Sequence, residues 1–388
     1  YELGQVYRKF LAKSAPWYDK KIPRTDTPEW FMRNPLWIVN LGQNRRRLPA
    51  VRYLNRYFEV PTSYIVSIIT APGGGAGRYG PRYQLRPEVL DCIRELREEG
   101  IRFQTYTNPR LWYCGPGAEK MNDYSTTGKL WSIKDEKGEP HILRFDREDY
   151  VAPCLGEDKW LDYLCKRTKW VSETGVSGIY HDQLPVSVPF VCHDPTHGHK
   201  VGDPTVWAKG GLWRFCDYLM GDLRKEHPEI VHTGEDASEP YVNKIDGFLP
   251  WRFGRPGHVP LFQSVYVPRI QFLARGGDMH SVPGSYESFF PKYAEQLCYG
   301  EQIGWIEYNA ISYPSPRRGY LKKLAHCRYA LADFLNSSEM AAPLEYVLSP
   351  GKLTSVWGVM DRNVCTVDRV LSSAWRHIDG RQLVMFLN

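Results

Sequence analysis

The sequence has no long apolar run, no internal repeat and no low-complexity tract. A membrane-spanning helix needs roughly 18 or more consecutive apolar residues, and none of the 388 residues belongs to such a run. The nine cysteines are an odd number and include no Cys-x-x-Cys pair, which argues against a full disulfide framework and a structural zinc module. The net charge of +6 is spread along the chain, which disfavours nucleic-acid binding. We therefore expect no membrane and no nucleic-acid partner.

Phosphate-binding motifs are missing as well. Residues 73–78 are rich in glycine, but they lack a Gly-Lys-Ser/Thr ending and no helix follows directly. A flexible active-site loop is the better interpretation, and we predict no cofactor. The chain begins at Tyr1 and shows no signal peptide, so we expect a processed or trimmed N-terminus. A secreted or periplasmic location is slightly favoured over a cytoplasmic one, and the oligomeric state is open.

Aromatic residues are abundant instead. The chain has 13 Trp, 25 Tyr and 15 Phe, which together make up 14% of it. Apolar sugar faces stack on aromatic rings, while the polar groups of Trp and Tyr can bind hydroxyl groups. This composition therefore suits carbohydrate binding, and a large aromatic core explains it equally well.

Strand-like and helix-like segments alternate after an amphipathic N-terminal helix. The predicted strands are residues 36–39, 64–70, 101–107, 176–182, 229–235, 247–251, 260–266 and 304–308. The predicted helices are residues 49–58, 87–99, 158–173, 206–225, 288–299 and 319–335. Eight strands with helices between them predict an α/β fold of the (β/α)8 barrel type, and a doubly wound open sheet is the alternative.

The pattern changes near the C-terminus. Residues 352–360, 363–372 and 382–387 resemble short strands without helices between them. We therefore predict a barrel domain over residues 1–344, with a helical lead-in. Residues 345–388 are predicted to form a β-rich segment, either an incomplete β-sandwich or a capping sheet.

Two carboxylates end predicted strands. Asp182 follows one apolar run and Glu235 the next. In a (β/α)8 barrel, residues at the C-terminal ends of strands face the active site. Two acids there suggest nucleophile and acid/base chemistry on a glycosidic bond. Alternatively, Asp182 caps the next element, and Glu239 competes with Glu235, although an acid near a helix start is also favoured by the helix dipole.

The loop after Asp182 carries several polar ligands within eight residues, namely Cys192, His193, Asp194, His197 and His199. They are a possible metal-ligand set, but their spacing matches no standard zinc signature. The histidines and the aspartate can equally bind sugar hydroxyl groups. We favour substrate binding and predict no metal, while a metal site and a simple structural loop stay open.

Other polar and aromatic residues lie at or just after predicted strand ends. As candidates for sugar platforms and hydroxyl ligands we take Asn108, Arg110, Trp112, His181, Gln183, Glu239, Trp251, Arg252, Gln263 and Tyr266. Packing at the mouth of the barrel is the alternative for each.

Several of these segments together resemble a known family. They are residues 178–183, 193–199, 235–241 and 246–248. In combination they resemble the DUF6259 family of glycoside-hydrolase-like barrels, and more distantly the superfamily of α-galactosidases and endo-α-N-acetylgalactosaminidases. The resemblance covers most of the chain from about Trp30 onward. The family would lead us to expect an aromatic and histidine-rich strand end at residues 64–78. This chain instead has a β-branched run followed by the glycine-rich loop.

The resemblance implies a retaining glycosidase whose nucleophile ends the fourth strand, which matches Asp182. In the endo-α-N-acetylgalactosaminidase branch the acid/base ends the next strand, which would be Glu235. In the α-galactosidase branch it lies further along, where this chain offers no equally clear carboxylate. The resemblance also implies flanking β-sandwiches, one before Tyr1 and one opened by residues 372–388. We expect a glycoside hydrolase with a carbohydrate substrate. The alternatives are a non-catalytic carbohydrate-binding barrel and a metal-dependent hydrolase that uses residues 193–199.

Overall fold

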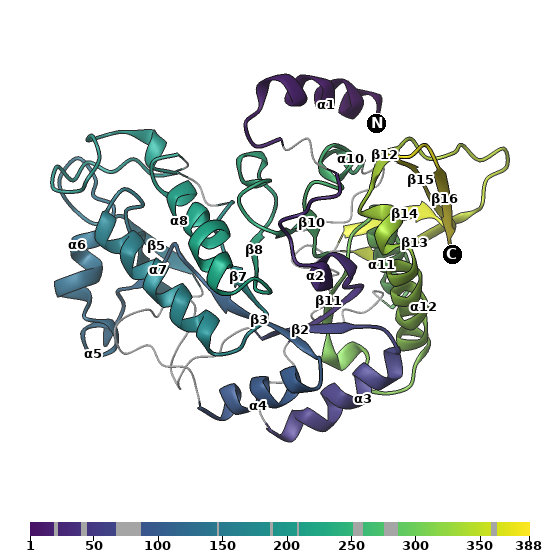
Figure 1. The fold of residues 1–388 in the computed structure, drawn as a ribbon, viewed down its shortest axis with the longest axis horizontal. Coiled ribbons are helices and arrows are strands. Elements are labelled where there is room, and N and C mark those ends of the chain that lie inside the picture. The colour runs from purple at the N-terminus through teal and green to yellow at the C-terminus, as the bar shows by residue number, and fades with distance from the viewer. Residues whose placement is uncertain are drawn as a thin grey trace. The chain divides into compact units, whose positions relative to one another are not determined.

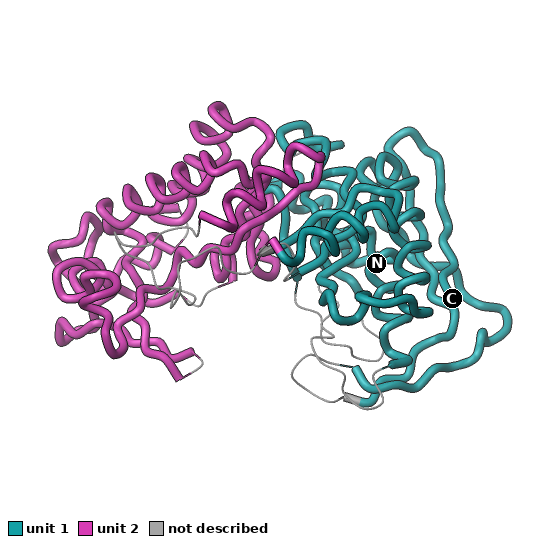
Figure 2. Tube along the Cα trace, turned by 90° about the horizontal axis from the view of Figure 1, so that it is seen from below, with its two compact units in different colours: residues 1–42, 46–65, 246–388 teal, residues 43–45, 66–245 magenta. Residues whose placement is uncertain are grey.

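The computed structural model describes residues 1–18, 22–39, 45–66, 87–145, 147–186, 189–207, 209–250, 259–274, 286–357 and 363–388. The chain divides into two compact units (Figure 2). Unit 1 contains residues 1–42, 46–65 and 246–388, and unit 2 contains residues 43–45 and 66–245. Among the described helices, none is both long and apolar enough to cross a membrane.

Eight parallel strands form the main sheet, in the order β10-β9-β8-β7-β3-β2-β1-β11. Their bounds are β1 Leu36–Val39, β2 Thr62–Val66, β3 Arg102–Thr107, β7 Gly178–His181, β8 Val231–Glu235, β9 Gly247–Leu249, β10 Gln271–Phe272 and β11 Ile303–Glu307. A parallel bridge between Leu273 and Gln302 joins the segments that follow β10 and precede β11. The order of strands therefore closes on itself, which confirms the predicted (β/α)8 barrel.

In unit 1, β1 pairs with both β2 and β11. All four residues of β1 are buried, as expected for a parallel strand that is covered on both faces. The Trp37 indole donates to Gln302 Oε1 at 2.6 Å, so this buried ring keeps a polar partner. The helices of this unit are α1 Glu2–Ser14, α2 Glu29–Arg33, α3 Leu48–Phe58, α10 Leu261–Tyr266, α11 Phe289–Cys298, α12 Pro316–Ala330 and α13 Ala332–Leu335.

The C-terminal part of unit 1 is antiparallel. Strands β12, β15 and β16 form one sheet, and β13 pairs with β14 in another. Their bounds are β12 Ser338–Ala341, β13 Lys352–Trp357, β14 Asn363–Asp368, β15 Leu371–His377 and β16 Gln382–Leu387. The predicted change to a C-terminal β-sheet region is therefore confirmed. Strand β12 was not predicted, and the single strand predicted over residues 363–372 is instead β14 and the start of β15.

Unit 2 contains β3, β7 and β8 and their covering helices. Helix α7 (Asp158–Glu173) buries Trp160, Leu164 and Val171, whose spacing places them on one face. Helices α7 and α8 lie side by side (Figure 1). The other elements are α4 Pro87–Glu98, α5 Ala118–Asn122, α6 Lys129–Trp131, α8 Leu212–Tyr218, α9 Arg224–Glu226, and the small antiparallel sheet of β4 Trp112–Tyr113, β5 Ile142–Phe145 and β6 Glu148–Val151.

Further element predictions differ from the structure. Residues 260–266 form helix α10 instead of a strand, and the strand of this region is β10, further along the chain. A short apolar run has no periodicity that separates a buried helix from a strand. The helix predicted over residues 206–225 begins later than expected: a short 3-10 turn ends at Trp207, α8 begins at Leu212, and helical structure continues through α9 to Glu226.

Candidate active site

The register of unit 2 aligns three strand ends. Thr107 of β3 pairs with His181 of β7, and His181 pairs with Gly234 of β8. The next position on each strand is Asn108, Asp182 or Glu235, respectively. Side chains alternate between the two faces of a strand, so these three side chains belong to the same face and the same level. The sheet therefore brings the two predicted carboxylates together with a predicted substrate ligand.

Three donors converge on the Asp182 carboxylate. The Tyr106 hydroxyl donates to Oδ2 at 2.5 Å, and Asn108 Nδ2 donates to the same oxygen at 3.1 Å. The Tyr180 hydroxyl donates to Oδ1 at 3.4 Å. Burial and the neighbouring Asp182 charge raise the pKa of Tyr106 well above its ordinary value, so its hydroxyl keeps the proton that it donates.

A backbone contact orients Asn108. The Arg110 amide donates to Asn108 Oδ1 at 2.9 Å, which directs Nδ2 toward Asp182. The side chain of Arg110 is buried, and its guanidinium lies 3.6 Å from the centre of the Trp207 ring. Burial lowers the pKa of Arg110 to about 9. Arg110 therefore supports the site from behind Asn108.

Asp182 and Glu235 form a hydrogen-bonded pair of carboxyl groups. Burial raises the pKa of Asp182 to about 7, and two effects of Glu235 add to this: its charge, and the hydrogen bond that it accepts from protonated Asp182. The hydroxyl groups of Tyr106 and Tyr180 act in the opposite direction. Asp182 is therefore partly protonated near neutral pH.

The chain turns sharply directly after each carboxylate. Gln183 has φ 58° and Asp236 has φ 55°, which is the left-handed region that residues other than glycine seldom adopt. Such conformations cluster at functional sites. Gly234, just before Glu235, is also constrained, because a Cβ there would lie 2.8 Å from the ring of Pro185. Backbone features on both sides thus fix where the two carboxylates point.

The raised pKa of Asp182 predicts a pH-dependent gain in stability for Asp182→Asn. The pKa is 3.8 in the unfolded chain and about 7 in the folded protein, so the native state binds more protons between these values and its stability falls as pH rises. At pH 8 the asparagine variant should be more stable than wild type by up to about 4 kcal/mol, and the gain should vanish near pH 4. Chemical unfolding at several pH values measures this. A difference that does not depend on pH would contradict the assignment.

His181 lies on the opposite face of β7 from Asp182 and is buried. Its Nε2 lies 3.1 Å from His232 Nδ1, its Nδ1 lies 3.2 Å from the Thr107 hydroxyl, and its ring packs against Phe215 of α8. Burial lowers the pKa of His181 to about 3, so the imidazole is neutral. Its predicted contact with substrate is untested, and the observed contacts are those of a residue between sheet and helix.

Trp112 is fully buried, which favours the packing alternative over a sugar platform. Its ring packs edge-to-face against Trp131 and Trp160, and Tyr163 adjoins it at a tilt. Trp112→Ala should therefore destabilise the fold by about 3–5 kcal/mol, as other buried Trp truncations do. Chemical unfolding of this variant measures the loss. An unchanged stability with a raised KM for substrate would instead identify a platform.

The loop residues predicted as substrate ligands each contact different partners. The backbone amide of His193 donates to Lys134 O at 2.9 Å, and Asp194 accepts from the amide and hydroxyl of Thr196. His197 and His199 instead face two cysteines. Glu239 begins a 3-10 turn that ends at Tyr241. Their predicted role as substrate ligands stays a prediction.

The remaining predicted ligands are placed as follows. Gln263 and Tyr266 belong to α10 of unit 1 and are buried. Gln263 donates to Glu301 at 2.7 Å, and the Tyr266 ring packs on Phe262. Trp251 and Arg252 lie outside the described residues.

Two residues of the site were missed in the sequence. Tyr106 and Tyr180 both donate to Asp182, but we treated them only as parts of strands. The alternation of side chains along a strand could have revealed them. Tyr180 lies on the same face as Asp182, and Tyr106 lies on the same face as Asn108.

The closed barrel and the two acids at neighbouring strand ends define a (β/α)8 protein with a candidate active site at those strand ends. Within this class, the protein belongs to the family described as "Domain of unknown function (DUF6259)", which residues 1–276 match.

Two sequence relatives and several solved structures are similar to this chain. "Putative glycoside hydrolase 22789" from Monosiga brevicollis is 22% identical, and the match covers 80% of this chain and 29% of that protein. "Putative glycoside hydrolase" from Bacteroides thetaiotaomicron is also 22% identical, and the match covers 99% of this chain and 56% of that protein. The α-N-acetylgalactosaminidase NagBb from Bifidobacterium bifidum, in complex with GalNAc, is similar with a TM-score of 0.67 and 13% identity over 99% of this chain and 63% of its own. The GH36 α-galactosidase AgaA from Geobacillus stearothermophilus has a TM-score of 0.56 and 9% identity over 90% and 48%.

The chain thus spans between 29% and 56% of the length of these two relatives. At 13% and 9% identity, the solved structures show that the fold is shared.

Proposed function

We propose that the protein is a retaining glycoside hydrolase, with Asp182 as nucleophile and Glu235 as acid/base. The observation that carries this proposal is the hydrogen-bonded pair of carboxyl groups, one at the end of each of two neighbouring strands. Both relatives named as glycoside hydrolases support the same activity.

In the first step, Asp182 attacks the anomeric carbon while the bond to the leaving oxygen breaks. Glu235 transfers its proton to that oxygen. Substrate binding replaces the contact between the two carboxyl groups, so Glu235 then faces the leaving oxygen. Asp182 keeps the donors Tyr106, Tyr180 and Asn108, which favour its ionised form.

In the second step, the Glu235 carboxylate takes a proton from water. The water oxygen attacks the anomeric carbon, and the ester bond to Asp182 breaks. Asp182 is released as a carboxylate and Glu235 is again protonated. The two inversions together give a product with the configuration of the substrate.

The hydrogen-bond contact between the acids supports retention. Retaining enzymes hold their carboxyl groups about 5–5.5 Å apart, and inverting enzymes about 6.5–9.5 Å apart, because a water molecule must fit between acid and sugar. Two acids that hydrogen-bond to each other in the free site are closer to the spacing of retaining enzymes than to that of inverting enzymes.

Substituents at C2 and the ring hydroxyl groups would be bound by residues around the pair. Asn108 and Gln183 adjoin Asp182 in space or in sequence, and the loop with His193 and Asp194 follows on the same segment. We keep Asn108, Gln183, His193, Asp194 and Glu239 as proposed substrate ligands. Because two of the similar structures act on α-GalNAc and α-galactose by name, α-linked galactosides and N-acetylgalactosaminides are the first substrates to test.

The experiment is hydrolysis of a panel of aryl α- and β-glycosides, with the first-formed anomer identified by NMR. The proposal predicts turnover of at least one glycoside with retained configuration. Inverted configuration would remove Asp182 as nucleophile. Glycan binding without any turnover, equal in wild type and Asp182→Asn, would identify a non-catalytic carbohydrate-binding barrel.

A further inference from the structure

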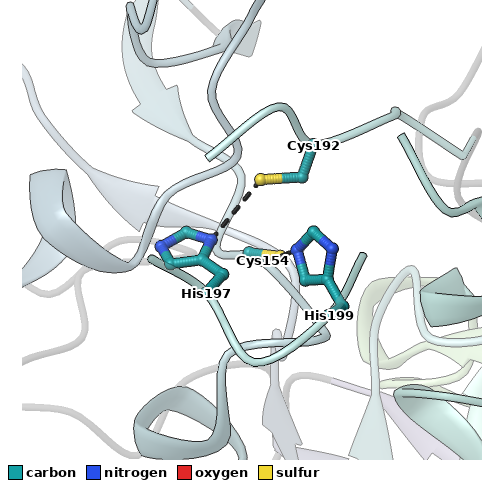
Figure 3. A group of neighbouring side chains, drawn as sticks. All are labelled: Cys154, Cys192, His197 and His199. Atoms are coloured by element: carbon teal, nitrogen blue, oxygen red, sulfur yellow. Dashed lines mark hydrogen bonds between the residues drawn. The ribbon is translucent and has the colours of Figure 1, made fainter. Parts of the chain in front are cut away.

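Two cysteines and two histidines of unit 2 converge on one point (Figure 3). Cys154 lies between β6 and α7, and Cys192, His197 and His199 lie in the loop after β7. Their ligand atoms all lie within 4.8 Å of one another, and three of the four residues are buried. Cys154 Sγ is 3.1 Å from His199 Nε2, and Cys192 Sγ is 3.4 Å from His197 Nδ1.

We propose that Cys154, Cys192, His197 and His199 bind one zinc ion in a tetrahedral site. Zinc binds thiolate sulfur at about 2.3 Å and imidazole nitrogen at about 2.0–2.1 Å, which places neighbouring ligand atoms of a tetrahedron about 3.3–3.8 Å apart. The distances within the cluster are close to this range. The inference does not depend on the proposed hydrolase activity.

The histidines are oriented as zinc ligands are. His197 Nε2 lies 2.9 Å from Leu130 O, and His199 Nδ1 lies 2.9 Å from Lys200 O. A carbonyl oxygen only accepts, so each of these nitrogens carries the proton and the other nitrogen presents its lone pair to the cysteines. Outer hydrogen bonds of this kind fix the tautomer and direction of metal-binding histidines.

The sulfur atoms are surrounded by backbone donors. The amides of Gly156 and Glu157 donate to Cys154, and the amide of Asp194 donates to Cys192. N–H donors stabilise a thiolate, which is the form that binds metal. The site therefore supplies backbone hydrogen bonds to both sulfur atoms.

Gly156 allows the close approach of the two segments. A Cβ at this position would lie 2.4 Å from His199 Cδ2, so any other residue would displace the imidazole from Cys154. This packing against a ring of the cluster is an independent sign that the chain is built around these four side chains.

Four protein ligands form a closed site, which is typical of structural zinc. The ion would tie the start of α7 to the loop after Asp182 and so hold the loop that carries His193 and Asp194. The residues of this loop supply only three of the four ligands. Cys154 lies far earlier in the chain, and its contribution follows from the fold.

The test is metal analysis of the protein purified without chelators. We expect about one zinc ion per chain. After zinc removal, addition of Co²⁺ should produce the visible absorption of tetrahedral cobalt together with a thiolate-to-cobalt charge-transfer band. A Cys154–Cys192 disulfide in peptides mapped without reductant, or no binding of either ion by the reduced protein, would overturn the proposal.

Variants locate the ion. Cys154→Ser and His199→Gln should lose stoichiometric zinc, and Gly156→Ala should bind it about 10–100-fold more weakly, as changes around a metal site do. Cys165→Ser is the matched control, because Cys165 is a partly buried thiol on α7 outside the cluster, and should bind zinc as wild type does. Undiminished zinc in Cys154→Ser and His199→Gln would overturn the assignment. If these variants do not fold, the cobalt spectrum of the unmodified chain decides.

Discussion

Asp182→Asn is expected to lower the rate of glycoside hydrolysis by about 10⁴-fold or more, which is the scale of losing a catalytic nucleophile. The amide cannot form the glycosyl ester, but it keeps the size of the carboxylate and can still accept from Tyr106. Steady-state kinetics on the best substrate of the glycoside panel measures the loss. Substrate affinity, measured by calorimetry, should change far less than the rate.

Two controls separate loss of chemistry from loss of structure. Asp162→Asn removes a carboxylate from the exposed face of α7, where Asp162 pairs with Lys166, and should leave the rate unchanged. The Asp182→Asn protein should also be at least as stable as wild type at pH 8, because the substitution removes a carboxylate with a raised pKa. An active Asp182→Asn enzyme would contradict its role as nucleophile.

Glu235→Gln is expected to show a loss that depends on the leaving group. For sugar or alkyl leaving groups, the rate should fall by about 10²–10⁴-fold, the usual contribution of a general acid. For nitrophenyl leaving groups, which depart without a proton, the first step should be nearly normal and the glycosyl-enzyme should accumulate. Azide needs no general base, so added azide should restore turnover and yield the glycosyl azide.

Glu239→Gln is the matched test of the competing acid. Under this account Glu239→Gln should not change the dependence on leaving group, because Glu235 is the acid that hydrogen-bonds to Asp182. Azide rescue in Glu239→Gln together with none in Glu235→Gln would transfer the acid/base role to Glu239.

Much of the barrel could be predicted because its elements are locally encoded. β1 (Leu36–Val39), α7 (Asp158–Glu173) and β16 (Gln382–Leu387) have the predicted bounds. In each, a run of apolar residues or a helical period coincides with the final structure. The two carboxylates were found in the same way, since each directly follows a buried strand or ends one.

The errors arise where distant residues decide the structure. The apolar run over residues 260–266 is a helix that packs against α1, where Gly4 lies against Ser264 and Val265. Nothing within the run reveals this partner. The contact of Tyr106 and Asn108 with Asp182 likewise depends on the register of β3 and β7, which is set by the whole sheet. The metal-binding cluster also depends on a distant residue, because Cys154 joins it from another part of the chain.

Covalent trapping tests the central claim most directly. Wild-type protein is incubated with a fluorinated glycosyl fluoride of the sugar that it hydrolyses, and the labelled peptide is mapped by mass spectrometry. The account predicts one sugar per chain, attached through an ester to Asp182, and no label in Asp182→Asn. A label on any other carboxylate, or inactivation without a covalent adduct, would contradict the proposed double displacement at Asp182.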